Sequence, residues 1–352
     1  MIYNQAIKVC KTHLLPIISE LYGLKICEIK SINAHEGGRN LVYGCGNKII
    51  RIAFLKDRSY DDFLAETEYV RYLAENGGGV SNVVNSQNGN MVEKIIHDNH
   101  TFYICVFEKA KGKQLAENGY QYRESVPISE YYYNCGKVLG KLHQLSKEYT
   151  PKHRRYSFFD KFNTEYIGKL IPDSLPLLKE KMFSVLDELE KLDKDNETYG
   201  MIHFDYSDGN YNIDFETGQI TVYDFDNCCF GWYLYDLANL WMHGVGWIQF
   251  EPDPEKRKAF MDDYFNTVLE GYRSETALSG SMLDKLQLFI KAIITENIVD
   301  EFEVARNNSE PPECDEIMGY LAKCLEDDIP YKGFFSEIYL HETPFEHEER
   351  EI

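Results

Sequence analysis

The hydrophobic pattern of this chain changes about a third of the way along its length. Residues 24–108 hold short, β-prone apolar runs separated by turn-forming segments such as EGGRN, GCGN and NGN. A single helical pattern, DDFLAETEYVRYLAENGGG, interrupts these runs and ends at three glycines. Beyond about residue 113 the apolar residues take helical spacing, except near residues 200–226. This order predicts a strand-rich lobe followed by a helix-rich lobe.

Composition limits the classes of partner. With 58 acidic and 37 basic side chains the net charge is −21, which disfavours nucleic acid and would attract a cationic substrate, although solubility alone also explains such a surface. Nine scattered cysteines without a C-x-x-C pair indicate reduced thiols, and no apolar run approaches the ~20 residues needed to span a bilayer. We therefore expect a cytoplasmic protein that binds neither nucleic acid nor membrane.

The stretch MIHFDYSDGN crowds polar side chains into a few positions. His203, Asp205 and Asn210 form the pattern H-x-D-x-x-x-x-N, and Gly209 permits a tight turn before the Asn. The following segments read as strand, turn and strand, which returns Asp224 toward Asn210. A carboxylate and an amide oxygen that converge suit Mg²⁺, whose charge offsets the repulsion between acidic groups. Asp205, set apart from that pair, is free to accept a proton from an attacking hydroxyl.

HFDYSDGN, followed by VYDFDN and YDLANL, resembles the aminoglycoside phosphotransferase and choline kinase family, relatives of the protein kinases. The family pattern is His-x-Asp-x-x-x-x-Asn, then Asp-x-Asp or Asp-x-Glu, then Asp-Leu-Ala, and the resemblance covers most of residues 25–245. It implies an α+β, protein-kinase-like fold with a small antiparallel-sheet lobe at residues 1–108 and a larger, mainly helical lobe at residues 109–352. The hinge is expected at about residues 107–112, where the backbone of VFEKAKGKQL would hydrogen-bond adenine.

The resemblance also implies roles for the acidic residues. Asp205 would be the catalytic base, and Asn210 and Asp224 would hold Mg²⁺. Asp226 would be a second metal contact, with a surface carboxylate as the alternative.

Two further residues would support the catalytic loop. His203 would brace it, and Asp236 would accept hydrogen bonds from its backbone and start a helix. One position departs from the family, because Phe204 stands where Gly or a polar residue is usual.

The nucleotide site is expected in the first lobe. Gly37, Gly38 and Asn40 match the turn that covers the nucleotide in this family. Arg51 matches the strand cation that binds the α- and β-phosphates, and Glu66 matches the helix carboxylate that pairs with that cation.

An acidic stripe in the segment ENIVDEFEVARN bears on the phosphate acceptor. Glu296, Asp300 and Glu303 share one helical face, which is either solvated or a receptor for the ammonium group of a substrate.

The resemblance implies an ATP-dependent phosphotransferase that moves the γ-phosphate to a hydroxyl of a small molecule, with ATP and Mg²⁺ as cofactors and GTP left open as donor. The acidic charge balance favours an amine-bearing alcohol or an aminosugar as that molecule. Only eleven residues separate Asp224 from Asp236, too few for an activation loop with a phosphosite. Two alternatives stay open: a bacterial Ser/Thr protein kinase of the same fold, and a non-catalytic kinase-like scaffold of the spore-coat type.

Overall fold

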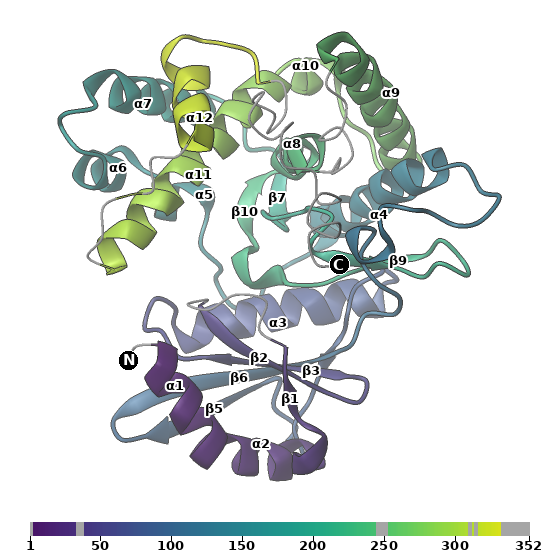
Figure 1. Cartoon of the computed structure of the whole chain (residues 1–352), viewed down its shortest axis with the longest axis vertical. Coiled ribbons are helices and arrows are strands. Elements are labelled where there is room, and N and C mark those ends of the chain that lie inside the picture. The colour runs from purple at the N-terminus through teal and green to yellow at the C-terminus, as the bar shows by residue number, and fades with distance from the viewer. Residues whose placement is uncertain (1–2, 33–38, 244–252, 309–311, 313–315, 332–352) are drawn as a thin grey trace, which may run out of the picture. The chain divides into compact units, whose positions relative to one another are not determined.

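The computed structural model describes residues 3–32, 39–243, 253–308, 312 and 316–331, within a chain that divides into two compact units (Figure 1). Unit 1 comprises Met1–Gly112, Glu148–Arg155 and Thr221–Asp226. Unit 2 comprises Lys113–Lys147, Tyr156–Ile220 and Asn227–Ile352. The sequence pattern had given no sign of the two later segments that belong to unit 1.

Unit 1 is built on an antiparallel sheet with the strand order β1-β2-β3-β6-β4, and β5 pairs with β6. The strands are β1 (Lys30–Ser31), β2 (Asn40–Cys45), β3 (Lys48–Ala53), β4 (Val83–Val84), β5 (Val92–His97) and β6 (His100–Glu108). In this register Arg51 of β3 lies opposite Val42 of β2 and Cys105 of β6. Arg51 is therefore on a central strand, paired on both sides.

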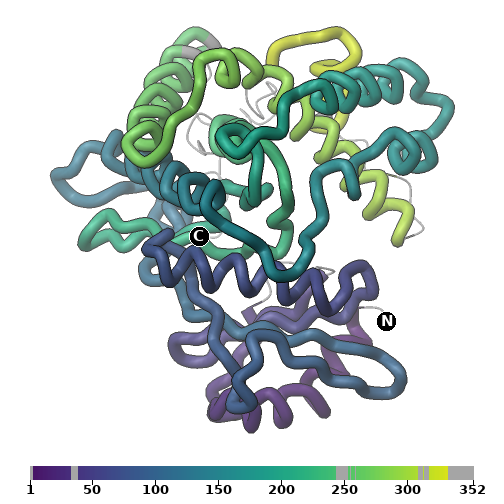
Figure 2. The backbone as a smooth tube through the Cα atoms, turned by 180° about the vertical axis from the view of Figure 1, so that it is seen from behind, coloured from purple at the N-terminus to yellow at the C-terminus, as the bar shows by residue number. Residues whose placement is uncertain are grey.

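Strand alternation assigns the two faces of the sheet to different helices. Ile50 and Ile52 pack with the N-terminal helices α1 (Tyr3–Val9), η1 (Cys10–Leu14) and α2 (Leu15–Tyr22). Ala53, on the other face, packs against Phe63 of α3 (Tyr60–Glu75). Figures 1 and 2 show α3 along one side of the sheet and α2 along the other. Arg51 has the same parity as Ala53, so its side chain faces α3.

Helix α3 begins at a capping box. The Ser59 N–H donates to Asp62 Oδ2 at 2.8 Å, and the Asp62 N–H donates to Ser59 Oγ at 3.2 Å. The start of α3 is thereby fixed just after the loop that carries Arg58.

Unit 2 is mainly helical. Its helices are η3 (Ala116–Asn118), α4 (Ser129–Glu148, whose last residue belongs to unit 1), α5 (Phe158–Lys161), α6 (Thr164–Leu170), α7 (Pro176–Glu190), α8 (Tyr233–His243), α9 (Pro254–Arg273), α10 (Gly280–Leu283), α11 (Leu286–Asn308) and α12 (Glu316–Glu326). Strand β7 (Tyr199–Ile202) pairs with β10 (Cys229–Trp232). Strands β8 (Tyr211–Ile213) and β9 (Ile220–Val222, whose last two residues belong to unit 1) form a short hairpin. Two short helices complete the described elements: η2 (Ile26–Glu28) and η4 (Phe225–Asn227).

Helix α8 forms the centre of unit 2. Leu234, Leu237 and Leu240 are fully buried, and α8 contacts α11, β7 and β10. Helices α4 and α9 approach closely enough for Gly136 of α4 to meet the backbone of α9, where any larger residue would clash. The segment HFDYSDGN leaves β7 directly beside this core.

Among the described helices, none combines the length and the apolar character needed to cross a lipid bilayer.

Candidate functional site

Asp236 fixes the start of the loop between β7 and β8. Its two carboxylate oxygens accept the backbone N–H groups of His203 and Phe204, each at 2.8 Å. It lies fully buried in the first turn of α8 and contacts His143 Nε2 at 3.1 Å. Burial lowers the pKa of His143, so the ring is neutral. Because a carboxylate only accepts, His143 donates from Nε2, and Tyr272 Oη, at 3.0 Å, donates to Nδ1.

Phe204 adopts a left-handed backbone conformation, with φ +75°, which L-residues other than Gly rarely take. Its ring stacks on Tyr235, with centroids 4.7 Å apart and planes 9° apart, and on Phe162 at 5.9 Å and 17°. Its carbonyl accepts a 2.6 Å hydrogen bond from Asn239 Nδ2. The strain gives a reason for Gly at this position in the family, and the stacking offsets that strain here.

Asn210 is tied to Asp205 at the other end of the loop. Its Nδ2 donates at 2.9 Å both to the carboxylate Oδ2 and to the backbone carbonyl of Asp205. The Asn210 N–H donates to Ser207 O at 2.9 Å and closes the intervening turn. This arrangement orients the Asp205 carboxylate and directs the Asn210 amide oxygen away from it.

Arg51 and Glu66 form a buried ion pair in unit 1. Arg51 Nη2 lies 2.7 Å from Oε1 and 2.6 Å from Oε2, and the side chains are 6% and 0% exposed. Burial alone would lower the pKa of Arg51, but the charge of Glu66 raises it well above its usual value. The guanidinium also lies 5.1 Å from the ring centroid of Phe107. Arg51 is therefore a fixed positive charge.

Asp224 is the open carboxylate of the Asp-x-Asp pair. Its side chain is 51% exposed, and its Oδ1 lies 3.7 Å from Arg51 Nη1. Its φ of +64° places it, like Phe204, in the left-handed region. Asp224 belongs to unit 1, whereas Asn210 belongs to unit 2.

Asp226 is held by its neighbours. Its Oδ2 lies 3.2 Å from Arg58 Nη1 and accepts a 3.1 Å hydrogen bond from Asn40 Nδ2. Burial would raise the pKa of Asp226, but four guanidinium groups outweigh burial and lower it to about 2: those of Arg58, Arg51, Arg39 and Arg155. Asp226 is thus ionised at any physiological pH.

Among the other predicted nucleotide-site residues, Asn40 begins β2, while Gly37 and Gly38 lie outside the described residues. Nowhere in the described part of the chain do three or more His, Cys, Asp or Glu side chains gather in a way that could hold a metal ion.

The acidic stripe on α11 has a partly buried end. Tyr235 donates a 2.6 Å hydrogen bond to Glu296 Oε2, and Lys161 Nζ lies 3.1 Å from Asp300 Oδ1. Burial, together with the negative charges of Asp300 and Asp205, raises the pKa of Glu296 to about 8, although the hydrogen bond from Tyr235 and the charge of Lys161 lower it.

Glu303 lies one turn farther along α11, with its Oε1 3.9 Å from Arg306 and its side chain 24% exposed. The three acidic residues therefore do not form one uniformly solvated face.

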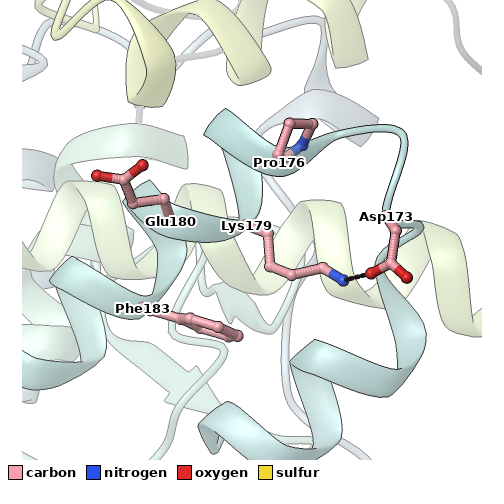
Figure 3. Close-up of a pocket in the computed structure, with 5 residues that line it drawn as sticks. All are labelled: Asp173, Pro176, Lys179, Glu180 and Phe183. Atoms are coloured by element: carbon pink, nitrogen blue, oxygen red, sulfur yellow. Dashed lines mark hydrogen bonds and ion pairs between the residues drawn. The ribbon is translucent and has the colours of Figure 1, made fainter.

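A surface hollow of about 260 Å³ lies on and beside α7 (Figure 3). Its lining is Asp173, Pro176, Lys179, Glu180 and Phe183. Lys179 Nζ forms a 2.7 Å ion pair with Asp173, drawn as a dashed line. The hollow contains none of the predicted site residues.

Several partners of the site residues carry no signal in the sequence. Arg58 and His143 stand outside the recognised motifs, and each meets its partner across 93 residues or more. Tyr235 begins the motif YDLANL, but nothing in that motif indicates its hydrogen bond to Glu296, 61 residues along the chain.

Comparison with known proteins gives consistent matches. Residues 35–278 match the model of a family described as the phosphotransferase enzyme family. The chain is 29% identical to the amicoumacin kinase of Bacillus subtilis (strain 168) over 260 residues, which are 72% of this chain and 74% of that protein.

Solved structures of similar fold include an amicoumacin kinase in complex with AMP-PNP, Ca²⁺ and Ami, with a TM-score of 0.79 at 22% identity, covering 96% of this chain and 99% of that one. A microcompartment-associated aminopropanol kinase has a TM-score of 0.63 at 19% identity, covering 90% of this chain and 98% of that one. These similarities confirm the α+β, protein-kinase-like fold that the sequence predicted.

Proposed function

The chain belongs to the phosphotransferase enzyme family, and on that premise we propose that it transfers the γ-phosphate of ATP to a hydroxyl of a small, amine-bearing alcohol. Membership of this family and the similarity to a curated kinase establish the coarser activity, phosphate transfer to a hydroxyl of a small molecule. They favour this activity over a protein kinase or a non-catalytic scaffold. The hydrogen-bonded pair of Asp205 and Asn210, in a loop fixed by Asp236, is the observation that carries the proposal.

We assign the metal to Asp224 and Asn210. Both offer hard oxygen donors of the kind that Mg²⁺ prefers: an exposed carboxylate, and an amide oxygen directed away from Asp205. When bound, Mg²⁺ neutralises the charge that develops on the transferred phosphate. The relative solved with AMP-PNP contains Ca²⁺, a divalent cation of the same ligand preference.

The phosphates of the nucleotide are assigned to Arg51. Both carboxylate oxygens of Glu66 accept from Nη2 of Arg51. These contacts hold the guanidinium in one orientation before ATP binds. Gly37, Gly38 and Asn40 would cover the nucleotide from the preceding turn.

Asp205 is assigned the role of base. Asn210 orients its carboxylate, and the turn between the two residues keeps it within a fixed loop. The proton of the acceptor hydroxyl would move to an oxygen of Asp205 as the hydroxyl oxygen bonds to the γ-phosphorus, while the bond between the γ-phosphorus and the β–γ bridging oxygen breaks and ADP leaves.

The acceptor is assigned to the acidic residues of α11. Glu296 and Asp300 would receive the ammonium group, whose positive charge would favour the ionised form of the Glu296 carboxyl, with Glu303 farther along the same helix. The name of one structural relative, an aminopropanol kinase, also indicates an amino alcohol.

The free thiols of the described cysteines fit the cytoplasmic location that the sequence predicts.

An acceptor screen by ADP release tests this function. The panel pairs 1-amino-2-propanol with 2-propanol, which lacks only the amine, and includes amicoumacin, choline and spectinomycin. We expect the amine to raise kcat/KM by about 10- to 100-fold, the effect of about 1.5–3 kcal/mol for a charged hydrogen bond. Phosphorylation of neutral or anionic alcohols alone would reject the amine assignment.

The pKa of Glu296 gives a pH prediction. In the unfolded chain this carboxyl ionises near 4.5, whereas in the folded protein its pKa is raised to about 8. The folded state therefore binds the proton more tightly, so this group's contribution to stability is present at low pH and is lost as the pH rises from about 4.5 to about 8. Glu296→Gln removes that loss. Melting curves at pH 5 to 8 should show the melting temperature of the variant rising relative to that of the wild type as the pH rises. An unchanged difference between the two melting temperatures would contradict the raised pKa of Glu296.

A further inference from the structure

We propose that Asp226, the second acidic residue of the Asp-x-Asp pair, is not a metal ligand in this protein but a positioning residue that holds Arg58 and Asn40 beside Asp224. The inference rests on the proposed function, which assigns the ion to Asp224 and Asn210. It departs from the role that the family resemblance implies for Asp226.

The first argument is the occupation of the Asp226 carboxylate. Its Oδ2 has Arg58 Nη1 at 3.2 Å and Asn40 Nδ2 at 3.1 Å. Mg²⁺ requires ligand oxygens at about 2.0–2.1 Å in near-octahedral geometry, and the guanidinium of Arg58 at this oxygen would repel a second cation. The carboxylate is thus already neutralised by a cation of the protein.

The second argument is the contrast in exposure within the pair. The side chains of Asp226 and Arg58 are 12% and 9% exposed, while that of Asp224 is 51% exposed. Removing one partner from a buried ion pair leaves the other charge unpaired. A metal ion could therefore bind Asp226 only by leaving the buried charge of Arg58 without its partner. The ion pair of Asp224 with Arg51 is longer, at 3.7 Å, and lies at a half-exposed side chain, where ion pairs contribute little.

The third argument is that the contacts of Asp226 hold separate segments of unit 1 together. Arg58 lies in the connection between β3 and α3, and Asn40 begins the strand after the turn expected to cover the nucleotide. The backbone carbonyl of Asp226 also accepts from Arg155 Nη2, and Arg155 Nη1 donates to Asp62 O at 2.8 Å in the first turn of α3. Residue 226 is thereby fixed to three separate segments of unit 1, two residues from Asp224.

Loss of the Asp226 charge should therefore weaken nucleotide binding but leave the affinity for the divalent ion unchanged. Asp226→Asn keeps the size of the side chain and one acceptor oxygen, so the fold should persist, but it removes the charge that holds Arg58. Asp224→Asn removes a ligand of the ion itself.

Electron paramagnetic resonance of Mn²⁺, with saturating AMP-PNP, separates the two roles. We expect the Asp226→Asn protein to bind Mn²⁺ within about twofold of the wild-type Kd, and the Asp224→Asn protein to bind it at least about tenfold more weakly, as loss of a charged ligand worth about 1.4 kcal/mol or more implies. Equal weakening in both variants, or one fewer Mn²⁺ bound by Asp226→Asn, would overturn the proposal. A wild-type protein that binds no Mn²⁺–AMP-PNP at all would instead overturn the proposed function, and this inference with it.

Calorimetry with AMP-PNP tests the link to Arg58. Arg58→Ala and Asp226→Asn should each weaken AMP-PNP binding by about tenfold. The double variant should bind AMP-PNP no more weakly than either single variant, because both changes remove the same contact. Arg58→Lys, which keeps the charge, should restore part of the affinity. Arg71→Ala is the matched control, since that guanidinium hydrogen-bonds to Val83 O and Asn85 Oδ1 instead. Additive losses in the double variant would show that Asp226 does not act through Arg58.

Discussion

Asp205→Asn is expected to lower kcat by about 100- to 10,000-fold, the usual contribution of a positioned general base, while ATP affinity stays within about twofold of the wild type. The substitution removes the group that accepts the hydroxyl proton. It leaves the loop intact, because Asn210 Nδ2 also donates to the backbone carbonyl of residue 205, a bond that does not depend on the side chain. Steady-state kinetics and calorimetry with AMP-PNP give the two quantities.

An exposed acidic residue of unit 2 provides the control for this experiment. Asp187→Asn breaks an exposed i, i+4 ion pair with Lys191 and should leave kcat unchanged. Undiminished turnover in Asp205→Asn would rule out its role as base. Loss of nucleotide binding together with turnover would show a damaged loop instead.

Glu66→Ala is expected to destabilise unit 1 by about 3–5 kcal/mol, the cost of leaving a buried charge without its partner. Arg51 is only 6% exposed, so water cannot replace the carboxylate. Because the chain has two units, native-state hydrogen exchange on peptides from β3 and α3 is the suitable measurement, since it reports unit 1 separately. The KM for ATP should rise in the same variant, because the guanidinium loses its fixed orientation.

Glu165→Ala is the matched control, because it removes a carboxylate from an ion pair with Lys169 that is exposed on both sides. It should leave exchange in β3 unchanged. If Glu66→Ala also left exchange in β3 unchanged, the buried pair would not stabilise this unit.

The parts of the fold that the sequence predicted depend on local patterns. The apolar spacing in DDFLAETEYVRYLAENGGG predicted the helix that the structure has as α3, and the H-x-D-x-x-x-x-N spacing marks the loop between β7 and β8. Such signals span only a few residues, so they can be read without knowing the rest of the structure. The roles of Asp205, Asn210 and Asp224 stay predictions for the experiments above.

The parts that could not be predicted depend on distant partners. Nothing in the local sequence indicates that Glu148–Arg155 belongs to unit 1 or that Arg155 reaches the backbone of Asp226. The left-handed conformation of Phe204 is equally hidden, because it is maintained by Tyr235, a residue brought near by α8. Propensity alone assigns Phe204 to ordinary extended backbone, and tertiary packing overrides it.

The central claim is that Asn210 and Asp224 bind one divalent ion that acts on the γ-phosphate, with Asp205 as the base. A crystal structure with Mg²⁺ and AMP-PNP tests it most directly. The account predicts Asn210 Oδ1 and Asp224 Oδ on the same ion at about 2.1 Å, with Asp226 still paired with Arg58. An ion coordinated by neither Asn210 nor Asp224, or a nucleotide bound away from Arg51, would contradict it.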